Sequence, residues 1–191
     1  MADTLTIYFK SLGGLSDEVI KTIADTFAPV VLKKDEFFVK EGQVCKKLGF
    51  VESGLLMYYK TAADGQEMVS DFAAEGNWVS QYQSFVNQQP SPLFIRAIEH
   101  CSVQAISLEN LTRLYALLPG FESMAKQLVE KVFMGMINQQ LAMQHLRAEE
   151  RYDKMCALYP AIIQRVPQYY IASYLGIAPP SLSRIRKNRA G

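Results

Sequence analysis

The chain has 191 residues, 49% of them hydrophobic, and its 20 Lys or Arg nearly balance 19 Asp or Glu to give a net charge of +1. This length allows one large or two small domains with an apolar core. No apolar run approaches the roughly 18 residues needed to cross a bilayer, and the N-terminus lacks a basic segment followed by an apolar stretch. We therefore expect a cytoplasmic protein with no membrane partner.

The first 28 residues have a helical pattern. Leu5, Phe9 and Leu12 are spaced to lie on one helix face, and a Gly-Gly pair then breaks the run. Ser16 is a suitable N-cap for a second helix, because acidic residues follow it directly.

Short runs rich in Val, Phe, Tyr and Ile alternate with turn residues between about Val30 and Leu108. Asp64-Gly65 is the clearest hairpin signal among the turns. Many short strands at this spacing predict a compact antiparallel barrel or sandwich. The expected strands lie near residues 37–39, 49–51, 55–60, 69–72, 93–98 and 103–107.

A long helix is predicted from Phe121 to about Arg147. Its apolar positions recur at alternating steps of four and three, as in a coiled coil. The helix could pack only on its own domain, but its apolar surface extends over more than one side, so we expect it to form a dimer interface. The residues expected in that interface are Leu128, Val132, Met136, Gln139 and Met143.

The C-terminal 38 residues contain no acidic side chain. Six Lys or Arg lie in this segment, from Lys154 onward, so the preceding 153 residues carry 14 basic and all 19 acidic residues. The overall charge is almost neutral, but the positive excess is concentrated at one end of the chain. Such a basic end typically binds a polyanion.

The same segment has the pattern of a helix-turn-helix. Gly176 is placed where the chain must reverse, a position that often needs positive φ, and Pro179 suits the first position of the next helix. At 100° per residue, Leu182 and Ile185 share one side of that helix with Arg189. The opposite and flanking positions are polar or basic. An apolar inner side and a basic outer side predict a helix that lies in the major groove of DNA.

Individual roles follow from these helical positions. Arg184 could contact guanine bidentately and Ser181 a base edge or phosphate, whereas Arg186 and Arg189 are better placed for phosphates. The alternative is a solvated amphipathic helix. The residues expected to contact DNA are Ser181, Ser183, Arg184, Arg186, Lys187, Asn188 and Arg189.

In its order of elements, the chain resembles the Crp/Fnr family, named after the cyclic-AMP receptor protein and the fumarate-nitrate regulator. The resemblance implies an α+β fold with a cyclic-nucleotide-binding-like β-roll sensor (1–118), a long dimerisation helix (119–147) and a helix-turn-helix domain (148–191). It also implies a homodimeric bacterial transcription regulator that binds palindromic duplex DNA and contacts RNA polymerase, here in a short form without a C-terminal wing. The residues that carry it are Glu41-Gly42, Ser53-Gly54, Asp64-Gly65, Glu75-Gly76-Asn77-Trp78, Phe94-Ile95-Arg96-Ala97 and Ile171 through Lys187.

The chain departs from the family in its nucleotide-binding cassette. The family's Gly-Glu becomes Ser80-Gln81 and its Arg-Ser becomes Ser91-Pro92, so the phosphate-binding arginine is absent. We do not expect cyclic AMP to bind in the family's manner; the effector is either a less anionic molecule or none, with the domain a fixed scaffold. Arg96 could serve as a substitute anion site or form a surface ion pair. The candidate effector pocket comprises Trp78, Gln81, Tyr82, Ser84, Ser91 and Arg96.

Other functions find less support in the residues. Cys45, Cys101 and Cys156 form no CxxC pair, and a metal-dependent enzyme on a cupin-like barrel would need several histidines where only His100 lies in the β region. No catalytic motif such as GxSxG is present. We therefore expect no metal, no evident cofactor and no enzymatic activity. The remaining alternative is a ligand-binding or protein-interaction module that does not bind DNA.

Overall fold

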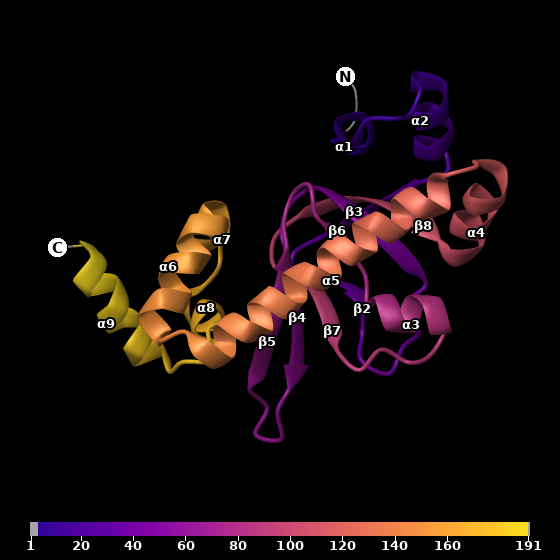
Figure 1. Cartoon of the computed structure of the whole chain (residues 1–191). Coiled ribbons are helices and arrows are strands. Elements are labelled where there is room, and N and C mark those ends of the chain that lie inside the picture. Colours follow the sequence, from indigo (N-terminus) through magenta and orange to yellow (C-terminus); the bar gives the residue numbers. More distant parts are fainter. Residues whose placement is uncertain (1–3, 191) are drawn as a thin grey trace. The chain divides into compact units, whose positions relative to one another are not determined.

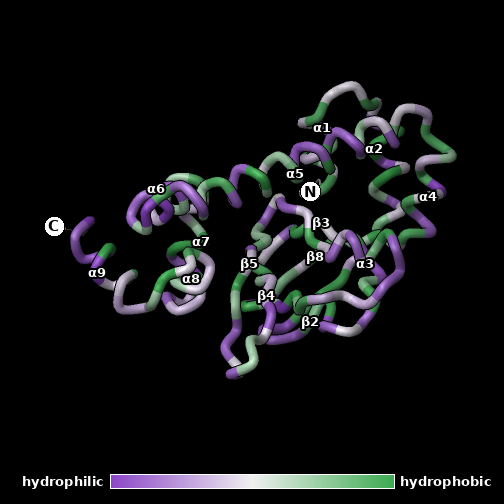
Figure 2. Tube along the Cα trace, turned by 60° about the horizontal axis from the view of Figure 1, so that its bottom comes forward, coloured by the Kyte–Doolittle hydropathy of each residue, from purple (hydrophilic) through white to green (hydrophobic). Residues whose placement is uncertain are grey.

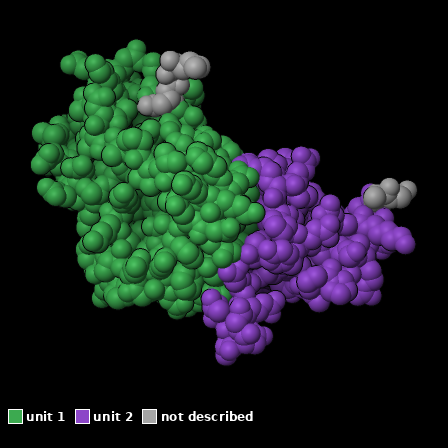
Figure 3. Space-filling model, turned by 180° about the vertical axis from the view of Figure 1, so that it is seen from behind, with its two compact units in different colours: residues 1–60, 71–122 green, residues 61–70, 123–191 purple. Residues whose placement is uncertain are grey.

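The computed structural model describes residues 4–190 and divides into two compact units. Unit 1 contains the described residues up to 60 together with 71–122, and unit 2 contains 61–70 and 123–191 (Figure 3). The tip of one hairpin, residues 61–70, thus groups with the C-terminal helices.

Unit 1 is a β-roll accompanied by short helices, which confirms the predicted α+β class (Figure 1). Its strands form two four-stranded sheets, in the orders β1-β8-β3-β6 and β2-β7-β4-β5. The strands are β1 (Ala28–Leu32), β2 (Phe37–Val39), β3 (Lys47–Ser53), β4 (Leu56–Thr61), β5 (Glu67–Ala73), β6 (Trp78–Val79), β7 (Phe94–Ala97) and β8 (Cys101–Ser107). The helices are α1 (Thr4–Leu12), α2 (Asp17–Ala24), α3 (Tyr82–Asn87) and α4 (Leu108–Leu117).

An aromatic cluster fixes α1 against the first sheet. Tyr8 lies 4.9 Å from Phe50 and 5.8 Å from Trp78, measured between ring centroids. The Trp78 indole Nε1 also donates a hydrogen bond of 3.2 Å to the Tyr8 hydroxyl. Phe9 and Phe50 are almost completely buried. Since buried aromatic side chains contribute large apolar areas, this cluster is a main anchor of the N-terminal helix.

The helices of the C-terminal part are α5 (Phe121–His145), α6 (Ala148–Leu158), α7 (Pro160–Arg165), α8 (Gln168–Tyr174) and α9 (Pro179–Ala190). Within the described residues no helix combines the length and apolar character needed to span a membrane.

Most strand positions expected from the pattern are confirmed, and the errors lie at short elements. Ser16 caps α2 by accepting a hydrogen bond from the Val19 amide, as predicted. Strands β1 and β6 and helices α3, α4 and α7 were not anticipated. Strand β6 and helix α3 are too short to show a period, whereas the leucines of α4 recur every three residues and are a helical signal that could have found it. Leu12 shares the sequence pattern of Leu5 and Phe9, but 37% of its surface is exposed at the end of α1.

Gly54 is the glycine of unit 1 that the fold requires most strictly. Its φ is +93°, and a Cβ atom added there would lie 2.7 Å from the Cα of Cys101 and still closer to the carbonyl oxygen of His100. Both obstacles are backbone atoms, so neither can move aside. The Gly54 amide also donates to the Glu75 carboxylate at 2.8 Å.

We predict that Gly54→Ala lowers the free energy of unfolding by more than about 3 kcal/mol, because left-handed strain and a backbone clash add. Gly42→Ala is the matched control: its φ is +80° but no atom lies within 4 Å of the added Cβ. That change should cost only about 1–2 kcal/mol of strain. Urea unfolding of both variants measures the difference, and equal losses would contradict the assigned clash.

Candidate nucleic-acid interface and effector region

Helices α8 and α9 are joined by a tight turn at Gly176. The φ of Gly176 is +65°, as predicted for a residue that reverses the chain. The Gly176 amide donates to the Ser173 carbonyl and the Ile177 amide to the Ala172 carbonyl, both at 3.0 Å. These bonds satisfy carbonyls at the end of α8 and fix where the next helix begins. Pro179 is the first residue of α9, as predicted.

Burial along α9 separates the two faces that the helical pattern predicts. Leu182 is fully buried and Ile185 is 5% exposed, so they form the inner side of the helix. The opposite residues are open to solvent, and the helix is coloured largely as hydrophilic in Figure 2. Of the expected DNA-contacting residues, Ser183, Arg184, Lys187, Asn188 and Arg189 are exposed, and Ser181 and Arg186 are half-buried.

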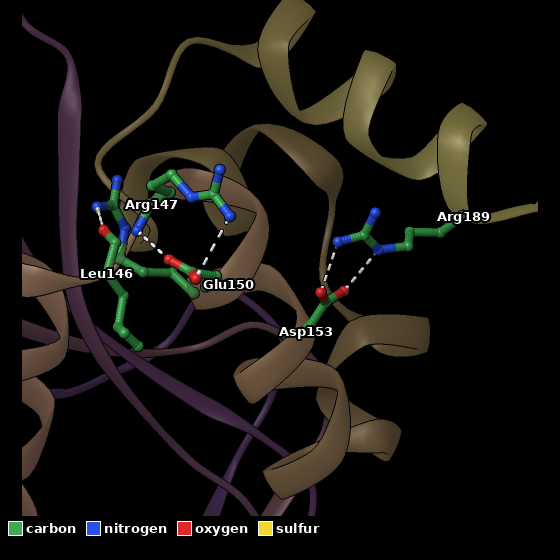
Figure 4. A network of polar contacts seen from close by, with 6 residues as sticks. Leu146, Arg147, Glu150, Asp153 and Arg189 are labelled. Atoms are coloured by element: carbon green, nitrogen blue, oxygen red, sulfur yellow. Dashed lines mark hydrogen bonds and ion pairs between the residues drawn. The ribbon is translucent and has the colours of Figure 1, made fainter.

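Arg189 has a partner that the sequence did not reveal. Its Nε and one terminal nitrogen (Nη2) contact the two carboxylate oxygens of Asp153 at 2.9 and 2.6 Å, a bidentate pair (Figure 4). The hydrogen bonds from Arg189 lower the pKa of the Asp153 carboxyl. Asp153 is the residue just before the acid-free segment. The positive charge of Arg189 is therefore balanced inside the protein, which changes the phosphate-binding role expected for it.

Arg151 joins the end of the long helix to the end of α8. Its guanidinium donates to the Leu175 carbonyl at 3.1 Å and to the Leu146 carbonyl at 2.8 Å. A terminal carbonyl of a helix has no partner within the helix, so a cation that bonds two such groups is favourable. Nearby, Glu150 accepts a 2.7 Å bond from the Arg147 amide and caps α6, and this bond lowers the pKa of Glu150 (Figure 4).

The hairpin tip that belongs to unit 2 bonds directly to α8. The Val69 amide donates to the Ser173 hydroxyl at 2.9 Å, and that hydroxyl lies 3.2 Å from the Glu67 carbonyl oxygen, to which it donates. The Tyr170 hydroxyl donates to the Glu67 carboxylate at 2.7 Å. Helix α8 is therefore held by residues of the hairpin that lie about a hundred positions earlier in the chain. No local sequence pattern predicts these contacts.

Helix α5 leaves a large apolar surface uncovered in the single chain. Of the five residues expected at a dimer interface, Val132 is 53% and Met136 is 63% exposed, while Leu128, Gln139 and Met143 are half-buried. The neighbouring Phe133 is also 58% exposed. Contiguous apolar side chains on an exposed helix typically mark an interaction surface.

The residues of the predicted effector pocket have different immediate partners in the structure. Trp78 belongs to the aromatic cluster beneath α1. Gln81 and Ser84 lie at the start of α3, and Gln81 caps that helix by accepting from the Ser84 amide at 2.6 Å. Tyr82, on the same helix, is 44% exposed. These contacts describe each residue by itself, and the effector pocket stays a prediction.

The buried hydroxyl groups of this region bond to the chain itself. Ser84 is 2% exposed; its hydroxyl accepts from the Cys45 amide at 2.9 Å and donates to the Gln89 carbonyl. Ser91 is equally buried and donates to the Leu93 carbonyl at 2.6 Å. These bonds hold the loop after α3, so the polar groups near the cassette have structural partners already.

Arg96 lies over an aromatic ring. Its guanidinium carbon is 4.9 Å from the centroid of Tyr59, a cation–π distance, and its Nε is 3.9 Å from an oxygen of Asp35. The Arg96 side chain is 15% exposed and that of Asp35 67%. Arg96 is therefore largely buried between an aromatic ring and a distant carboxylate, and both roles considered for it stay predictions.

A tyrosine and a carboxylate lie close to Ser80. The Tyr58 hydroxyl accepts from the Ser80 amide at 3.2 Å, and burial together with the nearby Asp71 charge raises the pKa of Tyr58. Desolvation by the surrounding protein also raises the pKa of Asp71 to about 6, although the residue as a whole is exposed to solvent. Its Oδ1 accepts from the Phe72 amide at 2.8 Å, which acts in the opposite direction. Acidic and phenolic groups here disfavour an anionic ligand.

Comparison with known proteins places the β-roll in a recognised domain family. Residues 29–117 match the family described as the cyclic nucleotide-binding domain. Among solved structures the chain is similar to the c-di-GMP responsive global regulator CLP of Xanthomonas campestris, at 16% identity and a TM-score of 0.70 over 92% of each chain. It is also similar to FixK2 from Bradyrhizobium japonicum, at 17% identity and a TM-score of 0.71 over 85% of this chain and 83% of that one.

The Catabolite Activator Protein of Thermus thermophilus is a further neighbour, at 18% identity and a TM-score of 0.56 over 94% of this chain and 85% of that chain. No curated protein sequence matches the chain. Residues 29–117 are thus similar to the cyclic nucleotide-binding domain, and the structural neighbours of the chain are regulators of the Crp/Fnr type. At these identities the likeness to solved structures concerns the fold.

We predict that stability depends on the ionisation of Asp71. Its folded-state pKa of about 6 lies above the ordinary value of an aspartate, so the charged form opposes folding and stability falls as pH rises from about 4 through 6. Asp71→Asn keeps an acceptor for the Phe72 amide but cannot ionise. Melting temperatures of both proteins should therefore diverge over this range, with the variant more stable above about pH 7. Parallel curves would contradict this assignment.

Proposed function

We propose that the protein is a homodimeric DNA-binding transcription regulator of the Crp/Fnr type. The observation that carries the proposal is the division of α9 into a buried apolar side and an exposed side with Arg184 and Lys187. A helix with these two faces suits the major groove, where arginine pairs with guanine and lysine with phosphate. The left-handed turn at Gly176 supports treating α8 and α9 as a helix-turn-helix.

The exposed surface of α5 supports the dimer. Val132, Phe133 and Met136 together leave more apolar area open to water than a solitary surface helix normally does. A two-fold axis along this helix would bury the surface and present two recognition helices to successive major grooves, about one helical turn of DNA apart. A palindromic operator then follows from the symmetry.

The β-roll would act as a sensor that does not use cyclic AMP. The cassette arginine is replaced by Ser91, and the Ser91 hydroxyl is engaged by the Leu93 carbonyl at 2.6 Å. A buried phosphate without a bidentate cationic partner loses strong charge-assisted hydrogen bonds. The nearby Asp71 adds a negative charge when it ionises above a pKa of about 6. Both features favour a neutral or cationic effector, or none, at this place.

We predict different consequences for two arginines of the same helix. On a duplex selected from a random library, Arg184→Ala should weaken binding by about 1–3 kcal/mol and relax the preference at one base position. Arg189→Ala should weaken binding to both duplexes alike, because it removes no base contact but leaves the Asp153 carboxylate without its cation near the DNA phosphates. Fluorescence anisotropy with the selected duplex and a scrambled one measures both. If each variant lost the same affinity for the selected duplex as for the scrambled one, neither residue would contribute to sequence specificity.

We also predict that Val132→Glu dissociates the dimer, since it places a charge on the apolar surface of α5. Gln127→Glu is the control, because Gln127 is exposed on the same helix, one position before Leu128, and outside the apolar stripe. Sedimentation equilibrium at tens of micromolar should give a dimer for the wild type and the control and a monomer for Val132→Glu. A monomeric wild type would refute the proposed assembly.

A further inference from the structure

An open groove of about 590 Å³ lies between two edge strands of the β-roll. Strand β1 ends one sheet and β2 ends the other, so the sheets are not joined along this side. Leu32 contributes from β1, and Phe37, Phe38 and Val39 from β2. None of the six residues of the predicted effector pocket lines this groove, which makes it a separate site.

The groove combines an apolar floor with cationic groups. Leu32 and Val39 are buried, and both phenylalanines are half-buried. Lys46 and Lys47 line the groove and are exposed, and a third lysine, Lys40, places its ammonium group 4.8 Å from the Phe37 ring centroid. Ligand pockets of about 300–1,000 Å³ are typically apolar with a few polar groups that orient the ligand, and this groove meets that description.

The wall that carries the two lysines is held from behind. The Gly42 amide donates to the Ser91 carbonyl, and the Ser91 amide to the Gln43 carbonyl, both at 2.8 Å. The Cys45 amide donates to the Ser84 hydroxyl at 2.9 Å, and the Ser80 hydroxyl donates to the Lys47 carbonyl at 3.1 Å. A wall fixed by four hydrogen bonds loses little backbone entropy when a ligand binds, which favours affinity.

We infer that this groove binds a small amphipathic carboxylate, with its apolar body against Phe37, Phe38 and Val39 and its head group at Lys46 and Lys47. The complementarity of charge selects an anion, and the apolar floor selects a hydrocarbon or aromatic body. The wall residues bond to Ser84 and Ser91, so an occupant would act directly on the loop after α3.

The experiment is isothermal titration calorimetry of the full chain with octanoate and, in parallel, with neutral octanamide. Octanoate should bind with one site per chain and octanamide at least about tenfold more weakly, as expected for a charge-assisted contact. Lys46→Glu/Lys47→Glu should weaken octanoate binding by about tenfold or more. Lys34→Glu/Lys60→Glu is the matched control, since both lysines are exposed in unit 1 and neither lines the groove.

Circular dichroism and a melting curve confirm that each variant is folded before titration. The inference is overturned if octanoate shows no saturable binding, if octanamide binds equally well, or if both lysine pairs weaken octanoate binding equally. The measurement uses no DNA, so it stands or fails independently of the role proposed for α9.

Discussion

The guanidinium of Arg151 is the interaction on which the C-terminal arrangement depends most. It bonds the Leu146 carbonyl just after α5 and the Leu175 carbonyl at the end of α8, at 2.8 and 3.1 Å. Both carbonyls would otherwise lack a partner in a partly buried place, which costs about 1–3 kcal/mol each. Because Gly176 follows Leu175 directly, the same cation also holds the turn that sets the direction of α9. The exposed basic side of that helix is thus oriented by a residue that does not belong to it.

The polar side chains around α3 bond to the chain itself. Gln81 caps α3, Ser84 joins the Cys45 amide to the Gln89 carbonyl, and Ser91 bonds to Leu93. These small polar side chains stabilise α3 and the loop that follows it. An anion there would have to break these internal bonds, whereas the groove between β1 and β2 offers lysines that line an open space.

Local and periodic features of the structure could be predicted from the sequence, and tertiary pairings could not. Capping rules predict the start of α2 after Ser16 and of α9 at Pro179. Backbone and period rules predict the reversal at Gly176 and the buried side formed by Leu182 and Ile185. The pairing of Asp153 with Arg189 spans 36 positions, and the contact of Tyr170 with Glu67 spans 103. No pattern within a window of one helix carries that information. Trp78 is assigned to a ligand pocket only by its position relative to the family's cassette. That position does not predict its contact with Tyr8 of α1.

We propose that α9 contacts the phosphates and bases of duplex DNA. The most direct test is the affinity of the full chain for a short duplex as a function of salt. Arg184, Arg186 and Lys187 supply three cationic groups per chain, so a dimer that uses all of them should give a slope of about −5 in a plot of log affinity against log salt. A slope near zero, or no binding at low salt, would contradict the account.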